Sequence, residues 1–131
     1  MRYVLDANAI LRYVDDEPGA ARVEQLINQA RTTASELSIS AVNWGGVVYG
    51  LIRQLSPTDA SVIVRKLRSL PITIIPVTDV EAEQAANFKT QYALPYADCF
   101  AAALAATLGA TLVTADFDLK SCGTAIKLEI L

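Results

Sequence analysis

The chain has 131 residues, 53% hydrophobic and 19% charged, which predicts one globular domain over residues 1–131 and excludes a disordered chain. No apolar run approaches the roughly 20 residues of a membrane span, and an early acid interrupts any signal-peptide pattern. The absence of histidine excludes His-based triads and metal sites, and a net charge of -3 argues against nucleic-acid binding through bulk positive charge.

Short apolar runs alternate with helical periodicity along the chain, which is typical of an α/β fold. In the first half, Asp16 is expected to cap a helix with Pro18 in its first turn, and Ser40 and Ser56 are expected to cap two further helices. The strands and helices expected here, in chain order, are a strand over 2–5, a helix over 7–14, a helix with the apolar stripe Val23, Leu26, Ile27 and Ala30, a strand over 36–40, a helix over 41–55, and a helix from Pro57 with the stripe Ala60, Ile63, Val64, Leu67 and Leu70.

The second half continues the alternation. Residues 72–77 predict a strand that Pro76 interrupts, and Thr78 with Glu81 forms a capping box for a helix with Ala82, Ala85, Ala86 and Tyr92 facing inward. Pro95 opens an alanine-rich helix that Gly109 ends. Strands over 111–114 and 125–130 complete a set whose intervening helices imply parallel pairing with helices on both faces.

Acidic side chains follow two of these strands. Asp6 comes directly after the first strand, and Asp116 follows the fourth strand after one residue, with Asn8 and Asp118 two positions further on in each case. Ligands of open parallel sheets bind outside the carboxyl ends of the strands. If the first and fourth strands are neighbours, Asp6 and Asp116 meet there, and the first turn of the alanine-rich helix can bring Asp98 to the same place.

Three converging carboxylates repel one another, so either some are protonated or a hard divalent cation neutralises them. Without histidine or paired cysteines the ligands are oxygens, which favours Mg²⁺ or Mn²⁺. Such an ion activates water and stabilises charge on a phosphodiester. Each residue alone also has a structural interpretation: Asp6 as a helix cap, Asp98 as a first-turn acid, and Asp116 as a turn residue. The joint placement of the three favours the functional interpretation.

The phrases LDANAIL, LPYADCFAAALA and LVTADFDL resemble the PIN-domain family, and more narrowly the VapC-type toxin ribonucleases of bacterial toxin–antitoxin pairs. The resemblance spans essentially the whole chain in length and motif order. It implies a three-layer α/β/α fold around a parallel five-stranded sheet, and RNA cleavage by a water activated by Mg²⁺ or Mn²⁺ on four acids.

By position, the resemblance makes Asp6, Asp98 and Asp116 the catalytic metal ligands. Asn8 matches a polar residue that orients Asp6 or a bound water, Thr114 matches the threonine of a T-x-D phrase, and Asp118 is an auxiliary acid.

Gly46 departs from the family pattern. The second acid of the family is a glutamate in a phrase like VNWGEV, whereas this chain has AVNWGGVVYG, with Gly46 at the acidic position. Gly45, Gly46 and Gly50 lie inside a predicted helix, where each costs roughly 0.5–1 kcal/mol relative to alanine. Close packing is a plausible reason for Gly45 and Gly50, while Gly46 is interpreted as a lost carboxylate. The resemblance therefore predicts an intact fold and an impaired nuclease.

The resemblance also implies partners: an RNA substrate, a cognate antitoxin protein, and a homodimer or larger toxin–antitoxin assembly. Arg12, on the first helix near Asp6, is the first candidate for a phosphate contact. We expect a cytoplasmic protein without a membrane partner, with Cys99 and Cys122 as reduced thiols.

Two other functions compete with the ribonuclease hypothesis. One is a catalytically inactive PIN domain that only binds antitoxin or RNA. The other is a phosphatase or phospho-acceptor domain with Asp6 as the nucleophile, but Asn8 stands where that chemistry usually has a second aspartate.

Overall fold

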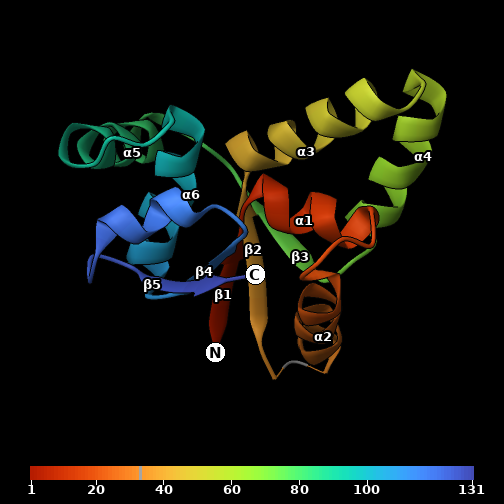
Figure 1. Cartoon of the computed structure of the whole chain (residues 1–131), viewed down its shortest axis with the longest axis horizontal. Coiled ribbons are helices and arrows are strands. Elements are labelled where there is room, and N and C mark those ends of the chain that lie inside the picture. Colours follow the sequence, from red (N-terminus) through yellow and green to blue (C-terminus); the bar gives the residue numbers. More distant parts are fainter. Residues whose placement is uncertain (33) are drawn as a thin grey trace.

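A parallel five-stranded sheet forms the centre of the molecule in the computed structural model, which describes residues 1–32 and 34–131 (Figure 1). The strands are β1 (Arg2–Leu5), β2 (Glu36–Ser40), β3 (Ile72–Ile75), β4 (Thr111–Thr114) and β5 (Lys127–Ile130). Their order is β3-β2-β1-β4-β5, and every neighbouring pair is parallel. Since β1 lies beside β4, with Leu5 opposite Val113, the carboxyl ends of these two strands are adjacent.

Helices connect the strands and cover both faces of the sheet. They are α1 (Ala7–Val14), α2 (Ala20–Arg31), α3 (Ala41–Gln54), α4 (Pro57–Arg68), α5 (Asp79–Gln91), α6 (Tyr96–Leu108) and the short 3₁₀ helix η1 (Phe117–Cys122). Figure 1 shows α5 and α6 on one side of the sheet and α2 on the other, with α1 and α3 across its upper end.

One hydrophobic core lies on each face of the sheet, between the strands and the helices, because successive strand residues point to opposite faces. Tyr3 and Leu5 of β1 belong to a core shared with α1, α2, α3 and α4. Val4, between them, belongs to a second core shared with α5, α6 and η1. Each of these strand residues is at most 6% exposed. This confirms the predicted three-layer α/β/α fold.

Local capping signals set four helix ends as the sequence predicts. The Ser40 hydroxyl accepts a hydrogen bond from the Val42 amide, and Ser56 caps α4 with Pro57 as its first residue. Thr78 and Glu81 form the expected capping box of α5. Gly109 follows α6 in the left-handed conformation, at φ 61°, which glycine adopts without strain.

Three local predictions are wrong. Helix α2 begins at Ala20 and has Gly19 at its N-cap, at φ 99°, so Asp16 does not cap it and Pro18 precedes it. Asp16 instead lies in the connecting turn, at φ 52°. Ala86 is exposed rather than inward-facing, because α5 buries only a narrow side around Ala85. The last strand is also shorter than predicted and begins at Lys127 rather than at residue 125.

Cys99 of α6 and Cys122 of η1 are buried free thiols in the second core. Burial in apolar surroundings raises the pKa of both thiols, which disfavours their thiolate forms. Across residues 1–32 and 34–131, none of the helices has the length and apolar character needed to cross a membrane.

Candidate metal-binding site

Asp6 lies where β1 ends and α1 begins, and its side chain is 3% exposed. One carboxylate oxygen, Oδ1, accepts a hydrogen bond of 2.9 Å from the Ala9 amide and caps α1. The other oxygen, Oδ2, accepts a hydrogen bond from the hydroxyl of Thr114 at the end of β4. Burial raises the pKa of Asp6, and these hydrogen bonds oppose the rise. Asp6 therefore caps α1 and is bonded to the end of the neighbouring strand β4 at the same time.

A hydrogen-bonded turn holds Asp116 beside this strand end. The Asp116 amide donates to the Thr114 hydroxyl oxygen at 3.0 Å, so the same hydroxyl connects Asp6 with the turn. The Asp116 carboxylate in turn accepts a bond of 2.9 Å from the Asp118 amide and caps η1. Thr114 itself is fully buried. The threonine thus fixes the geometry between two of the predicted acids.

Asp98 reaches the same region from the first turn of α6. The pKa of its half-buried carboxyl is raised to about 7, first by burial, then by a hydrogen bond with the Asp116 side chain, and then by the negative charges of Asp116, Asp6 and Asp118. Its Oδ2 atom is buried without a hydrogen-bond partner. The structure therefore brings Asp98 within electrostatic reach of all three other predicted acids.

A cavity of about 130 Å³ opens between the start of α1, α3 and the start of α6. Asp6, Asn8, Gly46 and Asp98 all line this cavity, so four of the predicted positions meet in one place. Its volume admits several water molecules, each of which occupies about 30 Å³ in the liquid.

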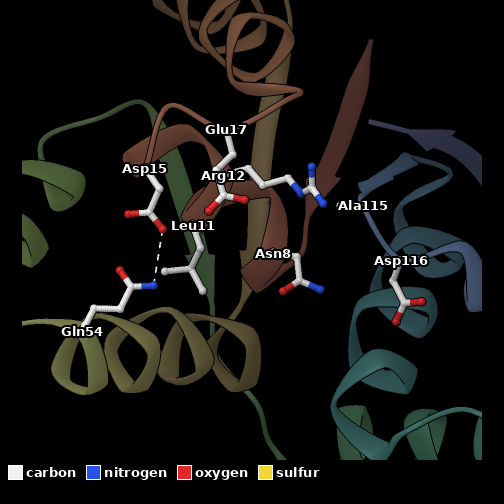
Figure 2. Close-up of a pocket in the computed structure, with 8 residues that line it drawn as sticks. All are labelled: Asn8, Leu11, Arg12, Asp15, Glu17, Gln54, Ala115 and Asp116. Atoms are coloured by element: carbon white, nitrogen blue, oxygen red, sulfur yellow. Dashed lines mark hydrogen bonds between the residues drawn. The ribbon is translucent and has the colours of Figure 1, made fainter.

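A second, larger pocket of about 450 Å³ adjoins the first and shares Asn8 with it (Figure 2). Asp116 and Arg12 line this pocket, and Figure 2 shows Asn8 between them in the view. The Arg12 guanidinium donates to the Pro18 carbonyl at 2.9 Å, and it forms no ion pair with any carboxylate in residues 1–32 or 34–131. Asp6 and Asp98 thus line the smaller cavity and Asp116 lines the larger pocket, whereas the predicted auxiliary acid Asp118 is exposed and lines neither.

Gly46 lies where α3 approaches α1. A Cβ atom at this position would be 3.2 Å from the Cβ atom of Ala7, a tight contact that requires a small shift. The neighbouring glycines differ from it. A Cβ at Gly50 would be only 2.8 Å from Leu11 Cδ1, so close packing explains that glycine, whereas a Cβ at Gly45 would meet nothing within 4 Å.

The donor set at this site consists of oxygens, which suits a hard divalent cation. The orphaned Oδ2 of Asp98 and the mutually repelling carboxyls are the features that a bound cation would satisfy. Nowhere in the described part of the chain do three His, Cys, Asp or Glu side chains gather closely enough to hold an ion. A cation here would therefore need amide or water oxygens beside the carboxylates, as Mg²⁺ sites usually have.

Sequence reasoning missed Asn43, which also lines the smaller cavity. Its side chain is 4% exposed, and its amide nitrogen donates to the Ala97 carbonyl at 3.1 Å. Its Oδ1 atom is buried without a partner. The available signal was a polar residue three positions before Gly46, on the same face of α3.

Trp44 and several basic side chains are engaged elsewhere. Arg68 lies over the Trp44 ring at 5.4 Å, and Trp44 packs against the core of the α1–α4 layer. Arg22 pairs with Glu129 at 2.7 Å. Arg12, unlike Arg22 and Arg68, lines a pocket that also contains a predicted site acid.

The fold and site together define an α/β protein with an acidic cavity at the carboxyl end of its central strand. The family model described as PIN domain matches residues 3–123, and the chain belongs to this family. No curated protein matches it in sequence.

Solved structures share the fold over essentially full length. VapBC2 from Rickettsia felis bound to a promoter DNA fragment has a TM-score of 0.80 at 18% identity, over 100% of this chain and 99% of that one. DNA-bound VapBC from Salmonella typhimurium has a TM-score of 0.78 at 18% identity, over 99% and 98%. VapBC-1 from nontypeable Haemophilus influenzae has a TM-score of 0.71 at 14% identity, over 99% and 98%.

Proposed function

We propose that this chain is a Mg²⁺- or Mn²⁺-dependent endoribonuclease toxin of a toxin–antitoxin pair, impaired because Gly46 replaces a metal-site glutamate. The observation that carries the proposal is the shared cavity. Asp6 and Asp98 line it, although they are distant in sequence, and Gly46 lines it at the position where the family pattern has its second acid. The similarity in fold to toxins of VapBC complexes supports the same function.

In this proposal, Asp6, Asp98 and Asp116 would hold the cation together with amide or water oxygens, because no three acidic side chains in the described part of the chain gather closely enough to hold it alone. When bound, the cation supplies Lewis acidity that lowers the pKa of a coordinated water and neutralises charge on a phosphodiester. Thr114 fixes one Asp6 oxygen and the Asp116 backbone, so that both acids keep their positions. Asn8 lies at the junction of the two pockets, where its amide can orient Asp6 or a water.

The larger pocket would receive the RNA backbone. Arg12 lines it beside the carboxylates Asp15, Glu17 and Asp116, and in the described part of the chain its guanidinium forms no ion pair within 4.0 Å. Because the net charge of the protein is -3, its overall charge does not attract RNA. In this proposal, Arg12 and the bound cation supply the local positive charge that the RNA phosphates need. Removal of Arg12 should weaken RNA binding with less effect on cation binding.

RNA cleavage with Mg²⁺, Mn²⁺ or EDTA tests the proposal. We expect slow cleavage that EDTA abolishes and that is lost in Asp6→Asn and Asp98→Asn. Asp59→Asn is a matched control, because Asp59 is exposed at the start of α4. If EDTA has no effect, or if the two site variants cleave like the control, the proposal is wrong.

A second candidate function is a PIN domain that binds antitoxin or RNA without cleaving. The glycine at position 46 favours it, because the position carries no carboxylate. Binding of an antitoxin or RNA, combined with no cleavage even after Gly46→Glu, would establish this alternative.

The proposal includes an antitoxin partner, assembly as a homodimer or larger complex, and a cytoplasmic location. The acidic cavity suits a cationic side chain of a partner on charge grounds. Co-purification with the product of a neighbouring small open reading frame, followed by mass measurement of the complex, tests the partner and the assembly together.

A further inference from the structure

A buried asparagine, Asn43, lines the acidic cavity. Its side chain is buried, its Oδ1 has no hydrogen-bond partner, and it lines the same cavity as Asp6 and Asp98. A buried amide oxygen without a partner is costly, because it has lost its hydration. Such an atom inside a site of carboxylates points to a ligand that supplies positive charge.

The orientation of this amide is set by its other end. The Asn43 nitrogen donates to the carbonyl oxygen of Ala97, which directly precedes Asp98 in α6. Exchange of the two amide atoms would place Oδ1 against that carbonyl oxygen, and two acceptors repel each other. The oxygen therefore stays directed away from Ala97.

Asn43 also lies one helical turn before Gly46 on α3, and both residues line the cavity. Asparagine oxygens are ordinary ligands of hard cations. Resting on the proposed function, we propose that Asn43 Oδ1 is a direct ligand of the divalent cation and partly replaces the carboxylate that Gly46 lacks. This agrees with the absence, within residues 1–32 and 34–131, of a carboxylate trio able to hold an ion by itself.

A structural role for Asn43 makes a different prediction. If the residue only positions Asp98 by its bond to Ala97, then its nitrogen matters and its oxygen does not. If it is a ligand, then its oxygen matters. Asn43→Asp keeps an oxygen and loses the donor, whereas Asn43→Leu has a similar shape and loses both, so the pair separates the two roles.

Calorimetric titration with MnCl₂ is the primary test, and thermal unfolding with and without MnCl₂ is the second readout. We expect Asn43→Leu to bind Mn²⁺ roughly tenfold more weakly, in the range seen when groups around metal sites are removed. We expect Asn43→Asp to bind at least as tightly as the wild type and to keep the Mn²⁺-induced rise in Tm. Asn87→Leu, at an exposed position of α5, is the matched control and should bind like the wild type.

The titration is repeated in the Gly46→Glu background, where the added carboxylate should reduce the effect of Asn43→Leu. An equal effect in both backgrounds, or weakened binding by Asn43→Asp, would overturn the ligand role. Binding lost in Asp6→Asn but unchanged in Asn43→Leu would overturn this inference and leave the proposed function standing. A wild type that takes up no Mn²⁺ would overturn both.

Discussion

Gly46→Glu is the substitution that most directly tests the site. It places a carboxylate in the cavity that Asp6 and Asp98 already line. Two effects must be separated: the fit of the new side chain between α1 and α3, and the charge that it brings.

The steric cost is modest. The new Cβ would start 3.2 Å from Ala7 Cβ, so the two helices must separate by a few tenths of an ångström. Overpacking of a core typically costs about 1–3 kcal/mol, and a single tight contact belongs at the low end. Replacement of a mid-helix glycine returns about 0.5–1 kcal/mol. We therefore expect a net change in the free energy of unfolding within about 1 kcal/mol for Gly46→Ala, which has the same Cβ and no charge.

The charge has an effect that depends on the cation. Without a cation, a third negative charge beside Asp6 and Asp98 should make Gly46→Glu less stable than Gly46→Ala. With Mn²⁺ present the order should reverse, because the added carboxylate is then a ligand. Since a positioned catalytic group contributes about 10²–10⁴ in rate, RNA cleavage should rise by a factor in that range.

The assay combines Mn²⁺ titration, urea unfolding with and without Mn²⁺, and cleavage of labelled RNA. Gly46→Gln is a second control that matches the size of glutamate without its charge. Equal Mn²⁺ affinity and equal cleavage in the Glu, Gln and Ala variants would refute the assignment of position 46 to the metal site.

Three further predictions concern stability. Gly45→Ala should raise the free energy of unfolding by about 0.5–1 kcal/mol in urea denaturation, because the new Cβ has no atom within 4 Å. Gly50→Ala should raise it less or lower it, because its Cβ would be 2.8 Å from Leu11 Cδ1. Equal gains in the two variants would contradict this reasoning. Asp6→Ala should lower the free energy of unfolding by about 1–2 kcal/mol because it removes the helix cap, whereas Asp6→Asn keeps an oxygen that can cap α1. Both variants should lose Mn²⁺ binding, and equal stability of the two would contradict the capping role. The folded-state pKa of Asp98 is raised to about 7, so the folded protein favours the protonated carboxyl, and the free energy of unfolding should fall as pH rises from about 4 to 7. Asp98→Asn should abolish this pH dependence, and urea unfolding at several pH values in this range measures it.

The sequence predicted the elements that depend on local chemistry. Helix caps are such elements, because each capping side chain bonds to a backbone group no more than three residues away, so that the sequence shows both partners. Examples are Ser40, Ser56 and the pair of Thr78 and Glu81. The predicted start of α2 was wrong because the chain turns through Gly19 in the left-handed region, so Gly19 rather than Asp16 is the N-cap residue.

The candidate site was predictable in part for the same reason. Asp6 and Asp116 follow strands, and the pairing of β1 with β4 brings them to one edge. The spacing of Asn43 from Gly46 places it on the same face of α3, but the orientation of its amide was not predictable, because it depends on the Ala97 carbonyl, 54 positions away in the sequence. The division of the acids between two pockets likewise depends on how α1 and α6 pack.

The hydrogen bonds of Asp6 give this residue a structural role in addition to its place in the cavity, and position 46 has no such role. Asp6 holds together a strand end, a helix start and the Thr114 hydroxyl, so mutational loss of this carboxylate also weakens the scaffold. The helix does not depend on a side chain at position 46, because α3 runs without interruption from Ala41 to Gln54 with a glycine there. Absence of a carboxylate at position 46 therefore leaves the scaffold intact, whereas loss of the Asp6 carboxylate removes bonds to two other elements.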